Sequence, residues 1–449
     1  MCFYNYETQE EIMKKNIGQI ILKKAKKLIP GGNQLLSKRS EMFLPSYWPN
    51  YYKKSLGCEI WDLENKKYYD FAGMGVTACS LGYANKKINS AIFNTFKKGN
   101  LTTLNSLEEF ELAKLFLKIH KWAGMAKFCK SGGEACLIAI RIARAFSKKE
   151  NIAFCGYHGW HDWYLSANLN NKSSLDNQLL SGLRTDGVSK TFKKSIFPFY
   201  YNKIESLEKI LKKNNSIGII IMEPMRSTIP KNNFLTKVRK LADKHKCILI
   251  FDEITSGFHD HFGGIHLKYK VNPDIAIFGK SIGNGYPISA IIGRTKIMNK
   301  SQDTFISSTM WTDRAGFVAA LETLKFMKKK KVQKQLVNKG KDLKKFWNNE
   351  ASKLGIKISI SGQDSMPYFK FEYENNLEIS TYFTQEMLKK GFLAGNLSPM
   401  SISHKKEILN KYKKNFKKVI TQISEILLSK KKIPLLGPVK HSTFRRLTD

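Results

Sequence analysis

The chain has 449 residues, of which 42% are hydrophobic, so it can bury a large core and form one large domain together with a smaller one. Its N-terminal segment carries acidic residues and no apolar stretch typical of a signal peptide, and no run approaches the roughly 18 apolar residues of a membrane span. The seven cysteines form no CxxC pair, which favours reduced thiols. We therefore expect a globular, cytoplasmic protein that is neither secreted nor inserted in a membrane.

A formal net charge of +39 makes nucleic-acid or other polyanion binding without catalysis the main alternative class of function. The basic residues are mostly lysines, and they spread over nearly every polar helix face instead of gathering beside aromatic residues or a nucleic-acid motif. A general bias towards lysine explains this pattern more simply. We expect no specific nucleic-acid partner.

The first part of the chain, residues 1–72, mixes a lysine-rich helix, a helix-breaking IPGGN at 29–33 and an alternating hairpin pattern over 57–73. From about 127 to 293, short continuous apolar runs such as NIAFCGY, SIGIIIMEP, CILIFDE and DIAIFGKS alternate with helical stretches. Continuous apolar strands separated by helices predict a mostly parallel sheet that is covered on both faces.

After residue 315, long lysine-rich helices alternate with two short strands, in KISIS (357–361) and PYFKFEY (367–373). We therefore predict an α/β fold with three segments. Residues 73–315 form the large domain with the mostly parallel sheet, and residues 1–72 and 316–449 join to form a smaller α+β domain.

Two opposite charges follow two of the predicted strands. Asp252 stands at the end of CILIFD, and Lys280 follows DIAIFG at the start of a glycine-rich loop. Open α/β sheets keep their ligands at the carboxyl ends of the strands. Taken alone, Asp252 could be an ordinary ion-paired acid, but a lysine at a comparable strand end places both charges at one crevice.

A desolvated lysine is a Schiff-base nucleophile, because burial lowers the pKa of its amine and frees the lone pair. Pyridoxal phosphate (PLP) needs such a lysine, a carboxylate beside its pyridine nitrogen and a cradle for its phosphate. Ser131, Gly132 and Gly133 lie between a predicted strand and a helix, where small residues leave backbone N–H groups open to an anion.

With these motifs in this order, the chain resembles the class-III (omega) aminotransferases of PLP fold type I, the aspartate aminotransferase-like fold, and among them the glutamate-1-semialdehyde 2,1-aminomutase-like branch. The resemblance covers about residues 30–320. The motifs that carry it are SGGEA for the phosphate turn, GYHGWHDWY (156–164), MEPM (222–225), FDEI and GKSIGNGYP.

The resemblance implies PLP as the cofactor and a homodimer with its active sites at the subunit interface. Lys280 would form the Schiff base and Asp252 would hold the proton of the ring nitrogen, so these are the expected catalytic residues. The other residues expected to bind the cofactor are Ser131, Gly132, Gly133, Tyr157, His158, Glu223, Ile254 and Thr309, the last of which would reach the phosphate of the neighbouring subunit.

The resemblance implies amino transfer between a small amine or amino acid and an aldehyde or keto acceptor, with intramolecular aminomutase chemistry as the alternative. The aminomutases have a substrate-carboxylate arginine shortly after a PGG break, where this chain offers Arg39 with a gap in the alignment or Lys38 without one. We prefer Arg39, because a planar guanidinium suits a carboxylate best, and Trp160 is a second candidate substrate residue. Gly133 lacks the hydroxyl that is common in the family's phosphate turn, and Lys130 is expected to compensate electrostatically.

The histidines do not point to a metal site. His158 and His161, or His259 and His261, lack an accompanying set of acids or cysteines with the spacing of a closed site, so no metal is expected. Arg445 and Arg446 near the C-terminus either cap the active-site pocket or lie in solvent, and the sequence does not distinguish these two positions.

Overall fold

The structure is a computed structural model that describes residues 16–178 and 181–443, so Arg445 and Arg446 lie outside the described residues. Its centre is a seven-stranded sheet with the strand order β4-β10-β9-β8-β7-β5-β6. These strands are Met125–Cys129 (β4), Asn151–Cys155 (β5), Ile196–Pro198 (β6), Ile217–Met222 (β7), Ile248–Asp252 (β8), Ile275–Phe278 (β9) and Ser289–Gly293 (β10). The predicted α/β fold with a mostly parallel sheet is confirmed.

The sheet is parallel except at one strand. β10 runs antiparallel to both of its neighbours, β4 and β9, whereas β5, β6, β7, β8 and β9 pair in parallel. All residues of β7, β8 and β9 are buried, as expected for strands that are covered on both faces.

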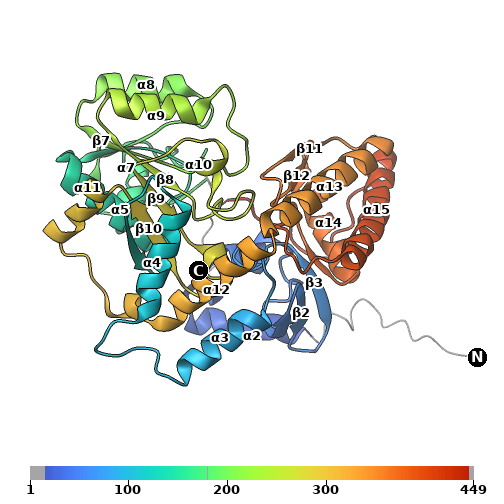
Figure 1. The fold of residues 1–449 in the computed structure, drawn as a ribbon. Helices are drawn as coiled ribbons and strands as arrows, with labels where there is room; N and C mark the ends of the chain where they lie inside the picture. Colours follow the sequence, from blue (N-terminus) through green and yellow to red (C-terminus); the bar gives the residue numbers. More distant parts are fainter. Residues whose placement is uncertain (1–15, 179–180, 444–449) are drawn as a thin grey trace, which may run out of the picture.

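Helices cover the two faces of the sheet and define two separate cores. Ile248 and Ile250 pack on one face with the apolar side of α5 (Gly132–Ser147), whereas Leu249 and Phe251 pack on the other with α8 (Ile204–Lys213) and α9 (Phe234–Lys244). Side chains alternate along a strand, so the next residue of the first set, Asp252, is directed to the α5 face. Figure 1 shows α8 and α9 side by side on one layer.

The two ends of the described chain share a second, four-stranded sheet with the order β1-β2-β3-β13. It contains Tyr52–Leu56 (β1), Glu59–Asp62 (β2), Lys67–Phe71 (β3) and Phe392–Ala394 (β13). β2 and β3 form the expected antiparallel hairpin, and β3 pairs in parallel with β13 from the other end of the chain. The predicted strands Ile358–Ser361 (β11) and Tyr368–Phe371 (β12) form an antiparallel pair.

The long helices after residue 313 pack with these strands and on the large sheet. In Figure 1, α13, α14 and α15 gather with β11 and β12 on one side of the molecule, which we call the C-terminal lobe. The remaining helices of more than one turn are α2 (Ile17–Leu28), α3 (Lys86–Phe96), α4 (Leu107–Ile119), α12 (Arg314–Lys329), α13 (Val332–Lys353), α14 (Asn376–Lys389) and α15 (Lys406–Ser429).

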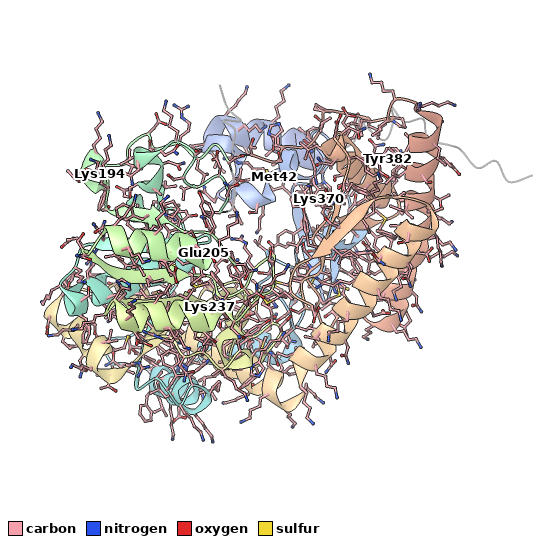
Figure 2. The ribbon with its side chains drawn as sticks, turned by 90° about the horizontal axis from the view of Figure 1, so that it is seen from above. Met42, Lys194, Glu205, Lys237, Lys370 and Tyr382 are labelled. Atoms are coloured by element: carbon pink, nitrogen blue, oxygen red, sulfur yellow. The ribbon has the colours of Figure 1, made fainter. Side chains whose placement is uncertain are left out.

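The lysines spread around the surface. In Figure 2, side chains tipped with nitrogen project around the outline of the molecule, with Lys237 on α9 and Lys370 on β12 in its two halves. Over the residues that the structure describes, no helix is both long enough and apolar enough to cross a membrane.

A loop of the C-terminal lobe is fixed to the segment that follows Asp252. The carboxylate of Asp260 accepts hydrogen bonds from the backbone N–H groups of Asp364 and Ser365, at 3.3 and 2.8 Å. The N–H of Gly362 donates to the carbonyl of Ser227, which follows β7, at 2.7 Å. The C-terminal lobe therefore contacts the carboxyl edge of the large sheet, where the ligand site was predicted.

We expect Gly340→Ala to destabilise the protein, because a Cβ at Gly340 in α13 would overlap the carbonyl oxygen of Asp364. The alanine favours helix by about 1 kcal/mol, but forcing the loop away costs about 1–3 kcal/mol. Gly395→Ala is the control, since a Cβ there meets nothing within 4 Å. Thermal unfolding should show a lower midpoint for Gly340→Ala only. Equal midpoints would show that α13 and the 361–366 loop do not pack as described.

Candidate active site

The two charged residues predicted from the strand ends lie on neighbouring strands. Asp252 is the last residue of β8, and it pairs in register with Ile277 of β9. Lys280 follows β9 by two residues. The expectation that both residues reach the same edge of the sheet is therefore met by the strand order.

The Asp252 carboxylate is buried and held on several sides. Its Oδ2 lies 2.8 Å from Nδ1 of His158 and accepts from the thiol of Cys136 in α5 at 3.4 Å, while its Oδ1 accepts from the N–H of Ile254 at 3.0 Å. Nε2 of His158 lies 3.2 Å from the carbonyl oxygen of Cys155. Each ring nitrogen of His158 therefore faces an oxygen, and the two contacts fix the orientation of the ring.

Cys136, His158 and Asp252 form a compact group of three metal-ligand types, with their ligand atoms within 4.8 Å of one another. Metal binding would require the thiolate form of the cysteine. Burial, followed by the nearby Asp252 carboxylate, raises the pKa of the Cys136 thiol well above its ordinary value. The protonated thiol donates to Asp252, so we interpret the group as a hydrogen-bonded support for the carboxylate.

The amine of Lys280 lies among several charged groups. Burial lowers its pKa from 10.5 to about 8, the charge of Arg226 lowers it as well, and the carboxylates of Glu223 and Asp252 act in the opposite direction. Its Nζ donates to Oγ1 of Thr255 at 3.0 Å, and part of the side chain remains accessible. An amine with this pKa has a substantial unprotonated fraction near neutral pH.

The backbone of Lys280 adopts a left-handed conformation, with φ of 46°. This region costs a residue with a Cβ of the order of 1 kcal/mol, so the surrounding structure must hold it there. The N–H of Ile282 donates to the carbonyl of Gly279 at 3.2 Å and closes a tight turn around the lysine. Because of this turn, the side chain of Lys280 takes a different direction from the one it would have if β9 continued.

The predicted phosphate turn begins α5. Ser131 caps the helix, and its hydroxyl and the carboxylate of Glu134 form a reciprocal capping box. A Cβ at Gly132 would lie 2.8 Å from Cδ1 of Ile254, and one at Gly133 would lie 2.9 Å from Cε1 of His161. The two glycines therefore allow the turn to pack closely against the Asp252–Ile254 segment and the loop after β5.

Lys130 does not take the compensating position expected beside this turn. Its Nζ forms an ion pair with Asp313, the residue that caps α12. The charge is therefore neutralised within the protein, and the missing hydroxyl at Gly133 has no replacement from this side chain.

Glu223 joins the loop of Tyr157 to the end of β7. Its Oε2 accepts from the N–H of Tyr157 and from Nη1 of Arg226, both at 3.0 Å. The guanidinium carbon of Arg226 lies 5.8 Å from the centre of the Tyr157 ring, within the range of a cation–π contact. Glycine is needed at Gly156, whose φ is 107° and where a Cβ would come within 2.7 Å of the Glu223 carboxylate.

Among the described residues, no hydrogen bond or ion pair joins three of the candidate residues to Lys280 or Asp252. Arg39 packs its guanidinium against Gly31, and its Nε is buried without a hydrogen-bond partner. Trp160 is 70% exposed, stacks on His161 and borders Gly133 on its outer side. Thr309 is exposed at the start of a short helical turn, Thr309–Thr312. Their roles remain predictions.

Reasoning from the sequence missed Thr255, Cys136 and Arg226. Thr255 stands three residues after Asp252, and Arg226 stands three residues after Glu223. Because both acids were predicted site residues, this proximity in the sequence was an available signal. Cys136 had no such signal, because its contact with Asp252 depends on the packing of α5 on the sheet.

The arrangement suits the groups of PLP. It offers a lysine with a low pKa, a buried carboxylate supported from three sides, and a glycine turn at a helix N-terminus whose Cβ positions are already filled by neighbours. The lysine, the carboxylate and the glycine turn match an aldehyde, a ring nitrogen and a phosphate, respectively.

Two solved structures with the same fold are a protein in its PLP internal aldimine form and an omega-transaminase. The FumI protein of Sphingopyxis sp. MTA144, solved in its PLP internal aldimine form, is 23% identical with a TM-score of 0.82, over 94% of this chain and 99% of that chain. An omega-transaminase from Sphaerobacter thermophilus is 20% identical with a TM-score of 0.81, over 91% of this chain and 98% of that chain. These likenesses define the fold as that of the fold type I transaminases.

The family follows from the sequence comparison. The class-III aminotransferase model matches residues 45–427. The 3-aminobutyryl-CoA aminotransferase of Cloacimonas acidaminovorans (strain Evry) is 31% identical over 78% of this chain and 83% of its own length. The glutamate-1-semialdehyde 2,1-aminomutase of Wigglesworthia glossinidia brevipalpis is 32% identical over 89% of this chain and 96% of its own length. The chain belongs to the class-III aminotransferase family, whose cofactor is PLP, and the resemblance inferred from its motifs is confirmed.

We expect Lys280 to titrate near pH 8 in protein freed of cofactor, because burial disfavours its charged form. Among the described residues, burial also lowers the pKa of Lys339 and Lys440 to about 8. Reductive methylation with ¹³C-formaldehyde followed by NMR titration should therefore show three early-titrating lysine amines beside the α-amino group, which ordinarily titrates near pH 8, and Lys280→Ala should remove one of the three. A Lys280 signal that titrates near its ordinary value would contradict the described environment.

Proposed function

We propose that this protein is a PLP-dependent aminotransferase that moves an amino group from an amine or amino-acid donor to an aldehyde or keto acceptor. The observation that carries the proposal is the pairing of two neighbouring strand ends, one bearing the amine of Lys280 and the other the buried carboxylate of Asp252. Membership in the class-III family supports the same reaction type.

The residues that would hold the cofactor follow from their chemistry. Lys280 would bind it covalently through its amine, and Asp252 would face the ring nitrogen. Tyr157 and Ile254 would contact the two ring faces. His158 would support the ring indirectly, through its contact with Asp252, and Glu223 would do so through its hydrogen bond to the N–H of Tyr157. Ser131, Gly132 and Gly133 would offer the start of α5 to the phosphate.

When bound, PLP supplies an electron sink for the carbon that carries the amino group. The chain's own residues then have distinct tasks. Lys280 takes up and returns a proton near neutral pH because its pKa is about 8. The hydroxyl of Thr255 positions the lysine amine. Asp252 stays oriented because His158 and Cys136 hold one of its oxygens.

Intramolecular amino transfer, as in an aminomutase, is the second candidate function. It is supported by relatives named glutamate-1-semialdehyde 2,1-aminomutase, one of which is 33% identical over 68% of this chain. Both reactions would use the same lysine and carboxylate. We favour the aminotransferase because the guanidinium of Arg39, the expected aminomutase carboxylate residue, packs against Gly31 and its Nε is buried.

We also propose that the enzyme is a homodimer with Thr309 at the subunit interface. Large apolar side chains are exposed on two segments of the single chain, with Leu104 and Phe305 each 82% exposed. The N–H of Arg314 donates to the carbonyl of Asn100 at 2.9 Å, which brings these two segments together. A second copy of the chain would cover this surface, and Thr309, exposed on the same segment, would reach its phosphate turn.

Two further parts of the interpretation remain proposals. The six described cysteines are free and buried, which supports a reducing, cytoplasmic compartment. We propose domain boundaries at 72/73 and 315/316, the second of which lies beside the start of α12 at Arg314.

The proposed reaction is tested by incubating PLP-loaded protein with a panel of amines and 2-oxo acids and measuring the new amino acid by chromatography. We expect turnover with at least one pair, and we expect Lys280→Ala to reduce it by at least about 1,000-fold, because the reacting amine is lost. Lys339→Ala is the control, since Lys339 also has a pKa of about 8 but bonds to the carbonyls of Ser401 and Ile402. Turnover by Lys280→Ala at the wild-type rate would overturn the assignment.

The aminomutase is separated from the aminotransferase by one substrate. Protein carrying the aminated form of the cofactor is mixed with glutamate 1-semialdehyde, and 5-aminolevulinate is measured. Formation of 5-aminolevulinate without an added acceptor would favour the aminomutase. Its absence, together with turnover of a donor and a 2-oxo acid, would reject it.

For the dimer, we expect Leu104→Glu to yield monomers with weaker cofactor retention, because burying a new charge at the interface is unfavourable. Leu428→Glu is the matched control: Leu428 is 80% exposed on α15, away from both segments. Size-exclusion chromatography with light scattering and the absorbance of bound cofactor provide the measurements. A monomeric wild-type protein that retains PLP would contradict the proposal.

A further inference from the structure

Arg226 is a cation of the active site that neither the motifs nor the expected cofactor contacts explain. It follows β7, three residues after Glu223, and reaches back so that its Nη1 donates to Glu223 Oε2 at 3.0 Å. Its guanidinium carbon lies 5.8 Å from the centre of the Tyr157 ring. Arg226 therefore lies on the same side of the site as the aromatic residue expected at the cofactor ring.

The guanidinium has unused hydrogen-bonding capacity. A guanidinium carries five N–H donors, and the one hydrogen bond of the Arg226 side chain among the described residues goes to Glu223. The side chain of Arg226 is 29% exposed, whereas that of Glu223 is 5% exposed. Glu223 thus fixes the position of the guanidinium on one side, and part of the Arg226 side chain remains exposed.

Arg226 is also close enough to the reactive amine to act on it. Its positive charge lowers the pKa of Lys280, whereas Glu223 and Asp252 raise it. Other arginines are engaged elsewhere: Arg39 packs against Gly31, Arg239 bonds to Asp243 and Asp274, and Arg314 forms two hydrogen bonds with Glu108. A substrate whose amine replaces Lys280 would therefore bring the rest of its chain near Arg226.

We infer that Arg226 binds the carboxylate of the substrate and so restricts the enzyme to amino acids and oxo acids, in preference to simple amines. A planar guanidinium matches a carboxylate with two parallel hydrogen bonds, which a lysine ammonium does not reproduce. The inference rests on the proposed function, since it assigns the substrate class of the same site. The inference also assigns the substrate carboxylate to Arg226 in place of Arg39.

The test uses three pairs of donors that differ by one carboxylate: alanine and ethylamine, 3-aminobutyrate and isopropylamine, and 4-aminobutyrate and propylamine. Single-turnover amination of the PLP-loaded enzyme gives the ratio of the two rate constants in each pair. We expect the wild type to prefer the carboxylated member of at least one pair by about 10- to 100-fold, the range for hydrogen bonds to a charged group. Arg226→Gln should reduce that ratio to near one, and Arg226→Lys should restore part of it.

Arg39→Gln is the matched control and should keep the wild-type ratio. If Arg39→Gln abolishes the preference and Arg226→Gln keeps it, the inference is overturned. Because Arg226→Gln leaves Glu223 buried without its cation, the double variant Glu223→Gln/Arg226→Gln is measured in parallel. A preference that returns in the double variant would show that Arg226 serves only to neutralise Glu223, and this result would also overturn the inference.

Two measurements do not depend on turnover. In cofactor-free protein, Arg226→Gln should raise the pKa of Lys280, since a neighbouring positive charge is removed. Calorimetry with propionate and butyrate, which lack an amine, should show binding to the wild type that weakens by about tenfold in Arg226→Gln. Unchanged carboxylate binding would overturn the inference.

The failures of the two proposals are distinguishable. If the wild-type enzyme binds PLP at Lys280 and reacts with both members of every donor pair at the same rate, the inference is overturned. The proposed aminotransferase activity is not affected by this result. A protein that takes up no PLP overturns the aminotransferase, whereas loss of carboxylate binding in its Arg226→Gln variant would still support Arg226 as the anion-binding residue.

Discussion

The site depends on fixing the carboxyl group of Asp252 in a buried place. Asp252 is 2% exposed, and an isolated carboxylate at such depth is strongly unfavourable. The contacts of His158, Cys136 and the Ile254 N–H with its two oxygens offset that cost and leave the carboxylate one orientation. Each contact comes from a different element, the loop after β5, helix α5 and the turn after β8, so three separate segments must fold correctly before Asp252 is stable in its position.

This dependence explains why the turn before α5 and the Asp252 carboxylate cannot vary independently. Cys136 lies one helical turn beyond Gly132, so the thiol reaches Asp252 only if the start of α5 approaches the 252–254 segment closely. Gly132 permits that approach, because any side chain there would meet Ile254. The small residues of the turn thus serve the packing of the helix on the sheet as well as the anion that the turn would bind.

The sequence was sufficient to predict the elements that repeat a simple pattern. The continuous apolar runs ending in Asp252 and preceding Lys280 indicated buried parallel strands, and their ends had to meet at one edge of the sheet. It was not sufficient for side chains on irregular segments. Arg39 was chosen by its distance from a Pro-Gly-Gly break, but spacing in a loop does not fix direction, and its guanidinium packs against Gly31. Arg226 was missed although it stands three residues after Glu223, because its contact with the Tyr157 ring depends on a residue that is distant in the sequence.

A low lysine pKa does not by itself identify the reactive amine in this protein. Burial lowers the pKa of Lys280, Lys339 and Lys440 to about 8. The amine of Lys339 donates to two backbone carbonyls, and that of Lys440 donates to the side chain of Asn396. Both are neutral partners that hold an ammonium in place. Lys280 donates to the hydroxyl of Thr255, and the charges of Arg226, Glu223 and Asp252 also affect its pKa. The protonation of Lys280 therefore responds to a charge that enters the site. That responsiveness, more than the pKa itself, is what an amine needs to pass protons to and from a substrate.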